Sequence, residues 1–162
     1  MAKSSDIPVT PAVRFLREKA IAFIPRLYQY VEHGGTHASA VELGVDEHCV
    51  IKTLVMETDP RSPLIVLMHG DREVSTKQLA RTLGVKQVTP VTEQSVTRLT
   101  GYQVGGCSPF GTRTKMPVYA ERTIFDLEKI YINGGKRGFL VEIDPRELKR
   151  VLDVTEVSAA VE

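Results

Sequence analysis

Residues 101–117, GYQVGGCSPFGTRTKMP, bring together in one short segment the residue types suited to ligand binding. The four glycines of this segment let the backbone approach a ligand closely or adopt positive φ, while Pro109 and Pro117 fix φ. This combination predicts a rigid, concave loop. Arg113 and Lys115 would project from one side of an extended chain, so two cations beside exposed N–H groups could hold an anion. A long ordered turn with two solvated cations fits the same residues equally well.

Cys107, near the middle of this loop, is a potential nucleophile. Such chemistry needs a base, and the sequence does not place the histidines at positions 33, 37, 48 and 69 beside it, so a small packing residue is the commoner role. Gly106 to Gly111 has the spacing of a phosphate-binding P-loop, but Thr112 and Arg113 follow where lysine and a hydroxyl residue are required. A nucleotide-hydrolysing enzyme is therefore not predicted.

Lys52 is the single charge in an apolar run, VIKTLVM, that predicts a β-strand over residues 50–56. An unpaired ammonium is heavily penalised in an apolar interior, so Lys52 either faces solvent or lies where its charge is used. The strand alone favours the solvent-facing position. Thr53 would point to the opposite face of the sheet.

Two tyrosines lie on a predicted edge strand, residues 23–31, in which a proline indicates the edge position. Tyr28 and Tyr30 would share one face. They would stack on a ligand if that face lined a cleft, and would pack in the core otherwise. His33 and His37 are separated by a glycine pair and have no carboxylate or cysteine that completes a ligand set. No metal or other cofactor is therefore predicted.

Length and composition are those of one globular domain. With 162 residues, of which 42% are hydrophobic and 25% charged, we expect a flexible lead over residues 1–9, a single domain over 10–152 and a loose tail over 153–162. No apolar segment resembles a membrane span or a signal sequence, and two cysteines are too few for a disulfide framework, so a cytoplasmic location without a membrane partner is expected. A net charge of +1 disfavours binding of a long nucleic-acid duplex, but allows one terminal nucleotide in a pocket.

Helix and strand signals are interspersed along the chain with hairpin spacing. Helices are expected over residues 11–21, 36–43, 76–83, 93–99 and 145–152, with Thr10, Thr36, Ser75, Thr92 and Asp144 as N-terminal caps and Glu147 completing a capping box. A buried strand is expected over residues 64–69, and a hairpin whose tight turn is Asn133–Lys136 near the C-terminus. These elements predict a mixed α/β domain with a mostly antiparallel sheet.

Four segments resemble, in matching order, the YbaK-type aminoacyl-tRNA editing family: TPAVRFL, VIKTLV, LTGYQVGGCSPFGTRTKMP and IYINGGKRG. The loop that is typical of that family, GGxSPxG, is matched in full by residues 105–111, and its strand lysine followed by threonine by Lys52 and Thr53. The resemblance covers residues 10–152. It implies the fold of these proteins, which are related to the editing domain inserted in bacterial prolyl-tRNA synthetase.

The resemblance implies a free-standing aminoacyl-tRNA deacylase. Such an enzyme removes a wrongly attached amino acid from the 3′ end of a tRNA, with Cys-tRNA(Pro) as the expected substrate and prolyl-tRNA synthetase as a further partner. The family is thought to use no protein nucleophile, and the thiol of a cysteinyl substrate attacks its own ester. The protein would then contribute position and electrostatics.

The resemblance also implies the site residues. Lys52 would steer the substrate or stabilise charge near the 3′ end, and Thr53 would offer a hydrogen bond, so both are candidate catalytic residues. The candidate substrate-binding residues would shape the amino-acid pocket and contact the ester carbonyl; they are Tyr30, Gly105, Gly106, Cys107, Ser108, Pro109 and Gly111.

Two departures from the family leave the edited amino acid open. The segment between Tyr30 and Lys52 is shorter than in YbaK itself, and Leu140 stands where YbaK has an aspartate. Two other functions remain as alternatives: a non-catalytic module of the same fold that binds tRNA or a synthetase, and a small-molecule enzyme that uses Cys107.

Overall fold

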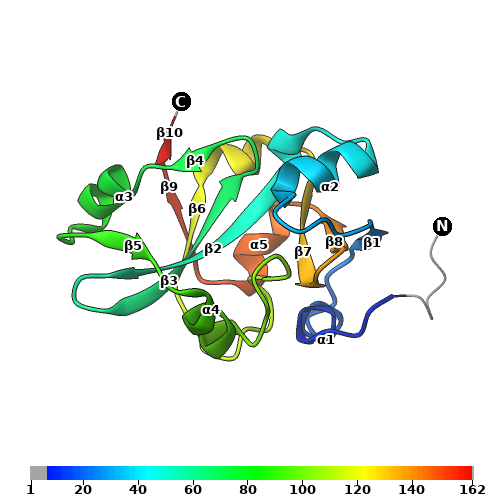
Figure 1. Cartoon of the computed structure of the whole chain (residues 1–162), viewed down its shortest axis with the longest axis horizontal. Helices are drawn as coiled ribbons and strands as arrows, with labels where there is room; N and C mark the ends of the chain where they lie inside the picture. The colour runs from blue at the N-terminus through cyan, green and yellow to red at the C-terminus, as the bar shows by residue number, and fades with distance from the viewer. Residues whose placement is uncertain (1–6, 162) are drawn as a thin grey trace.

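An eight-stranded sheet runs through the protein, in a computed structural model that describes residues 7–161 (Figure 1). The strand order is β1-β8-β7-β2-β3-β6-β9, and β5 also pairs with β2. The strands of this sheet are β1 (Ile24–Leu27), β2 (Val50–Thr58), β3 (Ser62–His69), β5 (Val88–Pro90), β6 (Val118–Glu121), β7 (Ile130–Lys136), β8 (Phe139–Ile143) and β9 (Val154–Val157). A second, two-stranded sheet pairs β4 (Glu73–Val74) with β10 (Ala160–Val161).

Helices cover both faces of the large sheet (Figure 1). The α-helices are α1 (Pro11–Glu18), α2 (Gly35–Leu43), α3 (Thr76–Leu83), α4 (Glu93–Thr100) and α5 (Glu147–Val151), and the 3-10 helices are η2 (Glu47–Cys49) and η3 (Arg122–Asp126). The pairs β1–β8, β8–β7, β2–β3 and β2–β5 are antiparallel, whereas β2–β7, β3–β6 and β6–β9 are parallel. The predicted mixed α/β fold with a mostly antiparallel sheet is confirmed.

The two faces of β2 are covered by different parts of the chain. Ile51 and Val55 point into the main core, together with side chains from α1, α4 and α5. On the other face, Val50 packs in a small cluster with α2, and Met56 packs in another with α3. Because side chains alternate along a strand, Lys52 lies on this second face, between the α2 cluster and the α3 cluster.

Three helices begin at the predicted caps. The side-chain oxygens of Thr10, Ser75 and Thr92 each accept a hydrogen bond from a backbone N–H three residues further on. The prediction for α2 is wrong: its N-cap is Gly34, and the hydroxyl of Thr36 contacts other parts of the chain instead. Caps that depend on contacts within the first helical turn were thus predictable. Thr36 is the exception, because its hydroxyl bonds to residues distant in the sequence.

The helix predicted over residues 145–152 is shorter and lacks the capping box. It begins at Glu147, and the Asp144 carboxylate accepts a hydrogen bond from the backbone N–H of Arg146, 2.9 Å away, before the helix starts. The hairpin of β7 and β8 is confirmed, but its tight turn is at Arg137–Gly138. Asn133 to Lys136 instead form an irregularity within β7, so the predicted turn is wrong by several residues.

The expected loose tail is also wrong. β9 pairs in parallel with β6 over Val154–Val157, and Val157 and Ala159 are buried. The backbone N–H of Ala159 donates to the buried Glu121 carboxylate at 2.7 Å. The expected flexible lead, residues 1–9, falls mostly outside the described residues.

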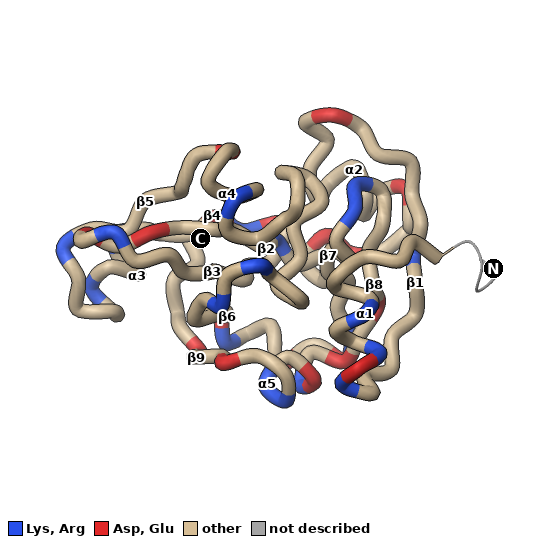
Figure 2. Tube along the Cα trace, turned by 90° about the horizontal axis from the view of Figure 1, so that it is seen from below, with Lys and Arg blue, Asp and Glu red and all other residues tan. Residues whose placement is uncertain are grey.

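Basic and acidic residues are interspersed along the trace and do not separate into a basic half and an acidic half (Figure 2). This agrees with the nearly balanced charge of the sequence. Within residues 7–161, no helix is long and apolar enough to span a bilayer.

Candidate active site

A pocket of about 450 Å³ opens beside β2, where this strand has no neighbouring strand from residues 7–161 along part of one edge. β7 pairs with β2 only at Val50 and Ile51, and β5 pairs with it only from Met56 onward. Between these two pairings the edge of β2 borders the pocket. A pocket of this volume can enclose a small ligand or the end of a larger one.

Six parts of the chain line the pocket. They are β2, the segment that follows β1, helix α2, the start of α4, the glycine-rich loop and the hairpin of β7 and β8. The lining residues include Tyr30, Thr36, Lys52, Thr53, Val104, Gly105, Cys107, Asn133, Arg137 and Leu140. Five predicted site residues therefore lie at one pocket: Tyr30, Lys52, Thr53, Gly105 and Cys107.

Lys52 is largely buried in this pocket. Its side chain is 18% exposed, so the solvent-facing position favoured by the strand pattern is wrong. The Nζ atom lies 3.3 Å from Oε1 of Glu73 on β4, and the Glu73 side chain is 84% exposed. An ion pair to so exposed a carboxylate is weak, because water screens it. The Lys52 ammonium therefore remains available to a negatively charged or carbonyl oxygen of a ligand.

Gly105 is fitted closely to the wall of the pocket. Its φ is +90°, and a Cβ atom at this position would lie 2.8 Å from the hydroxyl oxygen of Tyr30, so both backbone angle and space require glycine. The carbonyl of Gly105 accepts a hydrogen bond from Nδ2 of Asn133 at 3.0 Å, and Nε of Arg137 donates to the Val104 carbonyl at 2.9 Å. The Arg137 guanidinium also lies 5.0 Å from the centre of the Tyr30 ring. The hairpin thus fixes the loop.

The other predicted loop residues, Gly106, Ser108, Pro109 and Gly111, are not among the described residues that line the pocket. Gly106 packs against the backbone of the hairpin, and its N–H already donates to another loop carbonyl. Ser108 is fully buried and its hydroxyl oxygen accepts a hydrogen bond from the N–H of Phe110 at 3.1 Å. In this structure these residues belong to the part of the loop that does not line the pocket.

Cys107 lines the pocket but is only 8% exposed. Burial raises the pKa of its thiol to about 11, although a hydrogen bond with Thr100 acts in the opposite direction. The group is therefore a neutral thiol near pH 7, which is a poor nucleophile.

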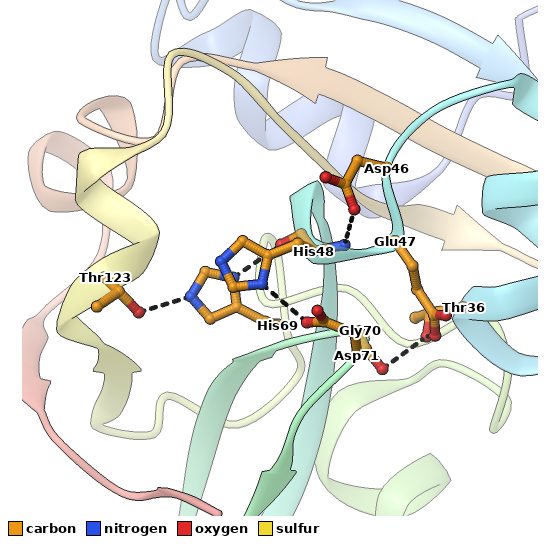
Figure 3. Close-up of polar contacts among 8 residues, drawn as sticks. All are labelled: Thr36, Asp46, Glu47, His48, His69, Gly70, Asp71 and Thr123. Carbon is orange, nitrogen blue, oxygen red and sulfur yellow. Dashed lines mark hydrogen bonds and ion pairs between the residues drawn. The ribbon is translucent and has the colours of Figure 1, made fainter. Parts of the chain in front are cut away.

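Two stacked histidines stand beside the start of β2 (Figure 3). The rings of His48 and His69 lie 3.7 Å apart and nearly parallel. The His69 Nδ1–H donates to the carbonyl of His48 at 2.7 Å, and the Thr123 hydroxyl lies 2.7 Å from its Nε2. The ring of His48 contacts the Asp71 carboxylate at 2.9 Å. Burial lowers the pKa of His69, so its ring stays neutral.

Figure 3 also shows the polar contacts of Thr36, a residue that lines the pocket. The hydroxyl of Thr36 lies 2.8 Å from the Glu47 carboxylate and 3.2 Å from the carbonyl of Gly70. Because Thr36 belongs to α2 and lines the pocket, these contacts hold the first turn of α2 against the turn that follows β3.

Sequence reasoning missed Asn133, Arg137 and Glu73 as parts of the site. Asn133 and Arg137 stand in the segment IYINGGKRG, so a signal was present, but their contacts with the loop depend on the fold. Glu73 follows a turn and gave no signal, because its contact with Lys52 joins two strands.

Residues 34–151 match the family model described as the aminoacyl-tRNA editing domain. The chain belongs to this editing-domain family. It is similar to "Putative Cys-tRNA(Pro)/Cys-tRNA(Cys) deacylase EbsC" of Enterococcus faecalis, with 28% identity over 149 residues that cover 91% of each chain. Another editing-domain relative is a proline–tRNA ligase of Brachyspira hyodysenteriae, with 28% identity over 53% of this chain but only 15% of the ligase.

Solved structures show the same editing-domain fold. The structure of "hypothetical protein APE2540" superposes with a TM-score of 0.85 at 22% identity, over 93% of this chain and 99% of that one. The structure of "a putative trans-editing enzyme for prolyl tRNA synthetase" has a TM-score of 0.83 at 19% identity, over 96% and 100% of the two chains.

Proposed function

We propose that this protein is a free-standing aminoacyl-tRNA deacylase of the cytoplasm, and that the pocket beside β2 is its active site. The observation that carries the proposal is the meeting of Lys52 and Gly105 at one pocket in a member of the editing-domain family. These residues come from two segments far apart in the sequence, and each was a candidate site residue by itself.

The pocket suits the end of a charged tRNA. Its volume of about 450 Å³ has room for a small amino acid and part of a ribose, and its lining combines apolar side chains with a few polar groups. A single terminal nucleotide carries few phosphates, so the nearly balanced charge of the protein is no obstacle.

In the proposed reaction the ester bond between the amino-acid carbonyl and a ribose oxygen breaks. A water molecule, or the substrate's own thiol in a cysteinyl ester, forms the new bond to the carbonyl carbon, and the ribose oxygen leaves with a proton. Negative charge develops on the carbonyl oxygen, and the Lys52 ammonium is the pocket group suited to stabilise it. The neutral thiol of Cys107 lines the pocket without serving as nucleophile.

Cys-tRNA(Pro) is the proposed substrate. The support is the name of the Enterococcus relative, together with the apolar side chain of Leu140, which lies in the pocket wall and would suit a small side chain of low polarity. Prolyl-tRNA synthetase is a further proposed partner, supported by the similarity to its inserted domain.

The test is incubation of the purified full chain with cysteinyl-, alanyl- and seryl-tRNA(Pro), with correctly charged prolyl-tRNA(Pro) as the control. Release of one or more of the three amino acids, with prolyl-tRNA(Pro) left intact, is the expected result. Binding of tRNA or of the synthetase without any release would instead favour the non-catalytic module. Absence of deacylation across a broad panel of charged tRNAs would refute the proposal.

A further inference from the structure

Thr53 lies in the gap between the two strand ladders on one edge of β2. The ladder with β7 ends at the pair Ile51–Ile132, and the ladder with β5 begins at the pair Met56–Pro90. Among the residues that the structure describes, no strand pairs with Thr53 on this edge, which borders the pocket.

The direction of the Thr53 backbone groups follows from the bonds of its neighbours. The carbonyl of Val55 accepts a hydrogen bond from Val91 N–H at 3.2 Å, on the side of β5, whereas the carbonyl of Val50 accepts from Gly70 N–H at 2.7 Å, on the side of β3. Successive residues of a strand direct their backbone groups to opposite edges. Thr53, two residues before Val55, therefore directs its N–H and its C=O to the open edge.

The side chain of Thr53 adds a second observation. Its Oγ1 atom is buried and has no hydrogen-bond partner among the residues described. A buried polar atom without a partner is uncommon in native proteins, and costs about 1–3 kcal/mol unless a ligand or water satisfies it. Thr53, a residue of the pocket lining, thus combines a buried hydroxyl that has no partner among the described residues with a backbone edge that no strand ladder of the described residues uses.

An aminoacyl ester carries a hydrogen-bond donor and an acceptor that can pair with the backbone groups of a strand edge. It carries an α-ammonium donor and a carbonyl acceptor on adjacent carbon atoms, in the arrangement of one residue of a β-strand. Two strand residues that face each other can exchange two N–H···O bonds, and proteins bind extended peptides at open edges in this way. The negative charge that develops on the ester carbonyl would strengthen the bond from the Thr53 N–H.

We propose that the amino-acid part of the substrate binds along the open edge of β2, as a strand of one residue. The Thr53 N–H donates to the ester carbonyl, and the α-ammonium donates to the Thr53 carbonyl. The substrate class is then esters of amino acids whose α-ammonium is unmodified, as distinct from other acyl esters of tRNA. This inference rests on the proposed deacylase function.

The first test compares each aminoacyl ester with its counterpart that lacks only the amine. The pairs are alanyl- with propionyl-tRNA(Pro), cysteinyl- with 3-mercaptopropionyl-tRNA(Pro), and seryl- with 3-hydroxypropionyl-tRNA(Pro). Each rate is divided by the spontaneous hydrolysis rate of the same ester, because the amine alters ester lability. For the preferred amino acid we expect acceleration at least about tenfold larger than for the counterpart, since a hydrogen bond from a charged group is lost.

The second test removes the Thr53 N–H by replacing the residue with its α-hydroxy counterpart, which converts one backbone amide to an ester. No strand ladder of the described residues uses this N–H, so the protein should fold, and kcat/KM should fall about a hundredfold for either ester of a pair. The Thr53→Val variant keeps both backbone groups and should keep the preference for the amine.

The outcomes separate the two proposals. Equal acceleration of both esters of a pair would overturn the strand-edge inference and leave the deacylase function standing. An unchanged kcat/KM in a folded α-hydroxy variant would also overturn it. Acceleration of none of the esters would refute the deacylase function, and this inference with it.

Discussion

Lys52 lies in surroundings that suit a positive charge with a chemical role. Its side chain is mostly withdrawn from water, yet the carboxylate that pairs with it, Glu73, is mostly exposed. Such a pair holds the amine in place without strongly neutralising it, because the interaction energy of an exposed carboxylate is small. A substrate oxygen can replace Glu73 at little cost.

Cys107 provides a test at the scale of the residue. Because burial raises its pKa to about 11, the thiol is protonated near pH 7, and replacement by alanine should leave deacylation within about threefold of wild type. The measurement is kcat/KM for the preferred tRNA, with the rate of iodoacetamide labelling as a second readout, which should be slower than for an exposed cysteine. A loss of a hundredfold or more in a folded Cys107→Ala protein would restore the thiol as a candidate nucleophile.

Residue types alone identified part of the site. The sequence indicated Lys52 as an unusual charge and the glycine-rich loop as a ligand-binding segment, and both line the pocket. It could not show that Gly105 faces the pocket while Ser108 faces the interior, because that depends on how the hairpin holds the loop. Nor could it show that Thr53 lies at a gap between two strand ladders, which is a property of pairing between distant segments.

At the scale of the element, the ring of a neutral histidine, His69, joins the end of β3 to η2 and η3 through its contacts with His48 and Thr123. Burial lowers the pKa of His69 below its ordinary value of 6.5, against a raising effect of its bond to the His48 carbonyl and of the nearby acids Asp71 and Glu121. An unfolded chain therefore takes up this proton before the folded protein does. The stability that the neutral ring contributes is complete above pH 6.5 and is lost as the pH falls from 6.5 toward the pKa of the folded state.

We therefore expect the free energy of unfolding to fall between pH 6.5 and pH 5 more steeply in wild type than in His69→Gln, which has no titrating group at this position. Urea denaturation at several pH values measures both slopes, and the other titrating groups are common to the two proteins. Equal slopes would show that His69 does not resist protonation in the folded state.

The C-terminal strand is a second test at this scale. Removal of the chain from Val154 onward eliminates β9, its parallel pairing with β6 and the buried side chains of Val157 and Ala159. We expect the free energy of unfolding, measured by urea denaturation, to be at least about 3 kcal/mol lower in the truncated protein than in the full chain, or the truncated protein not to fold.

The matched control for this truncation is Glu156→Ala, an exposed change on β9. The ion pair of Glu156 with Lys149 is at the surface, so this substitution should lower the free energy of unfolding by less than about 1 kcal/mol. A truncated protein as stable as the full chain would contradict the structural role of β9.

The elements differ in how far the sequence specified them. Helix starts at Thr10, Ser75 and Thr92 were predictable because each cap contacts its own first turn. β9 was missed because a short polar segment becomes a strand only through pairing with β6. The turn between β7 and β8 was misplaced because the side-chain oxygen of Asn133 accepts hydrogen bonds from the backbone N–H groups of Gly135 and Lys136, and β7 continues irregularly through these residues.

For the whole molecule, the balanced charge predicts a small electrostatic contact with tRNA. Basic and acidic residues are interspersed over the trace (Figure 2), and the net charge is only +1. We expect the logarithm of kcat/KM to fall with the logarithm of salt concentration with a slope no steeper than about −2, which corresponds to a decrease of at most about sixteenfold between 50 and 200 mM. A much steeper slope would indicate an extensive phosphate-binding surface.

The most direct test of the central claim is single-turnover deacylation of Cys-tRNA(Pro) by wild type, Lys52→Ala and Lys86→Ala. Lys86 is an exposed lysine outside the pocket, so its variant is a matched loss of one charge. The account predicts a rate at least about a hundredfold lower for Lys52→Ala and an unchanged rate for Lys86→Ala, with both variants folded. A Lys52→Ala protein that cleaves the ester as fast as wild type would contradict it.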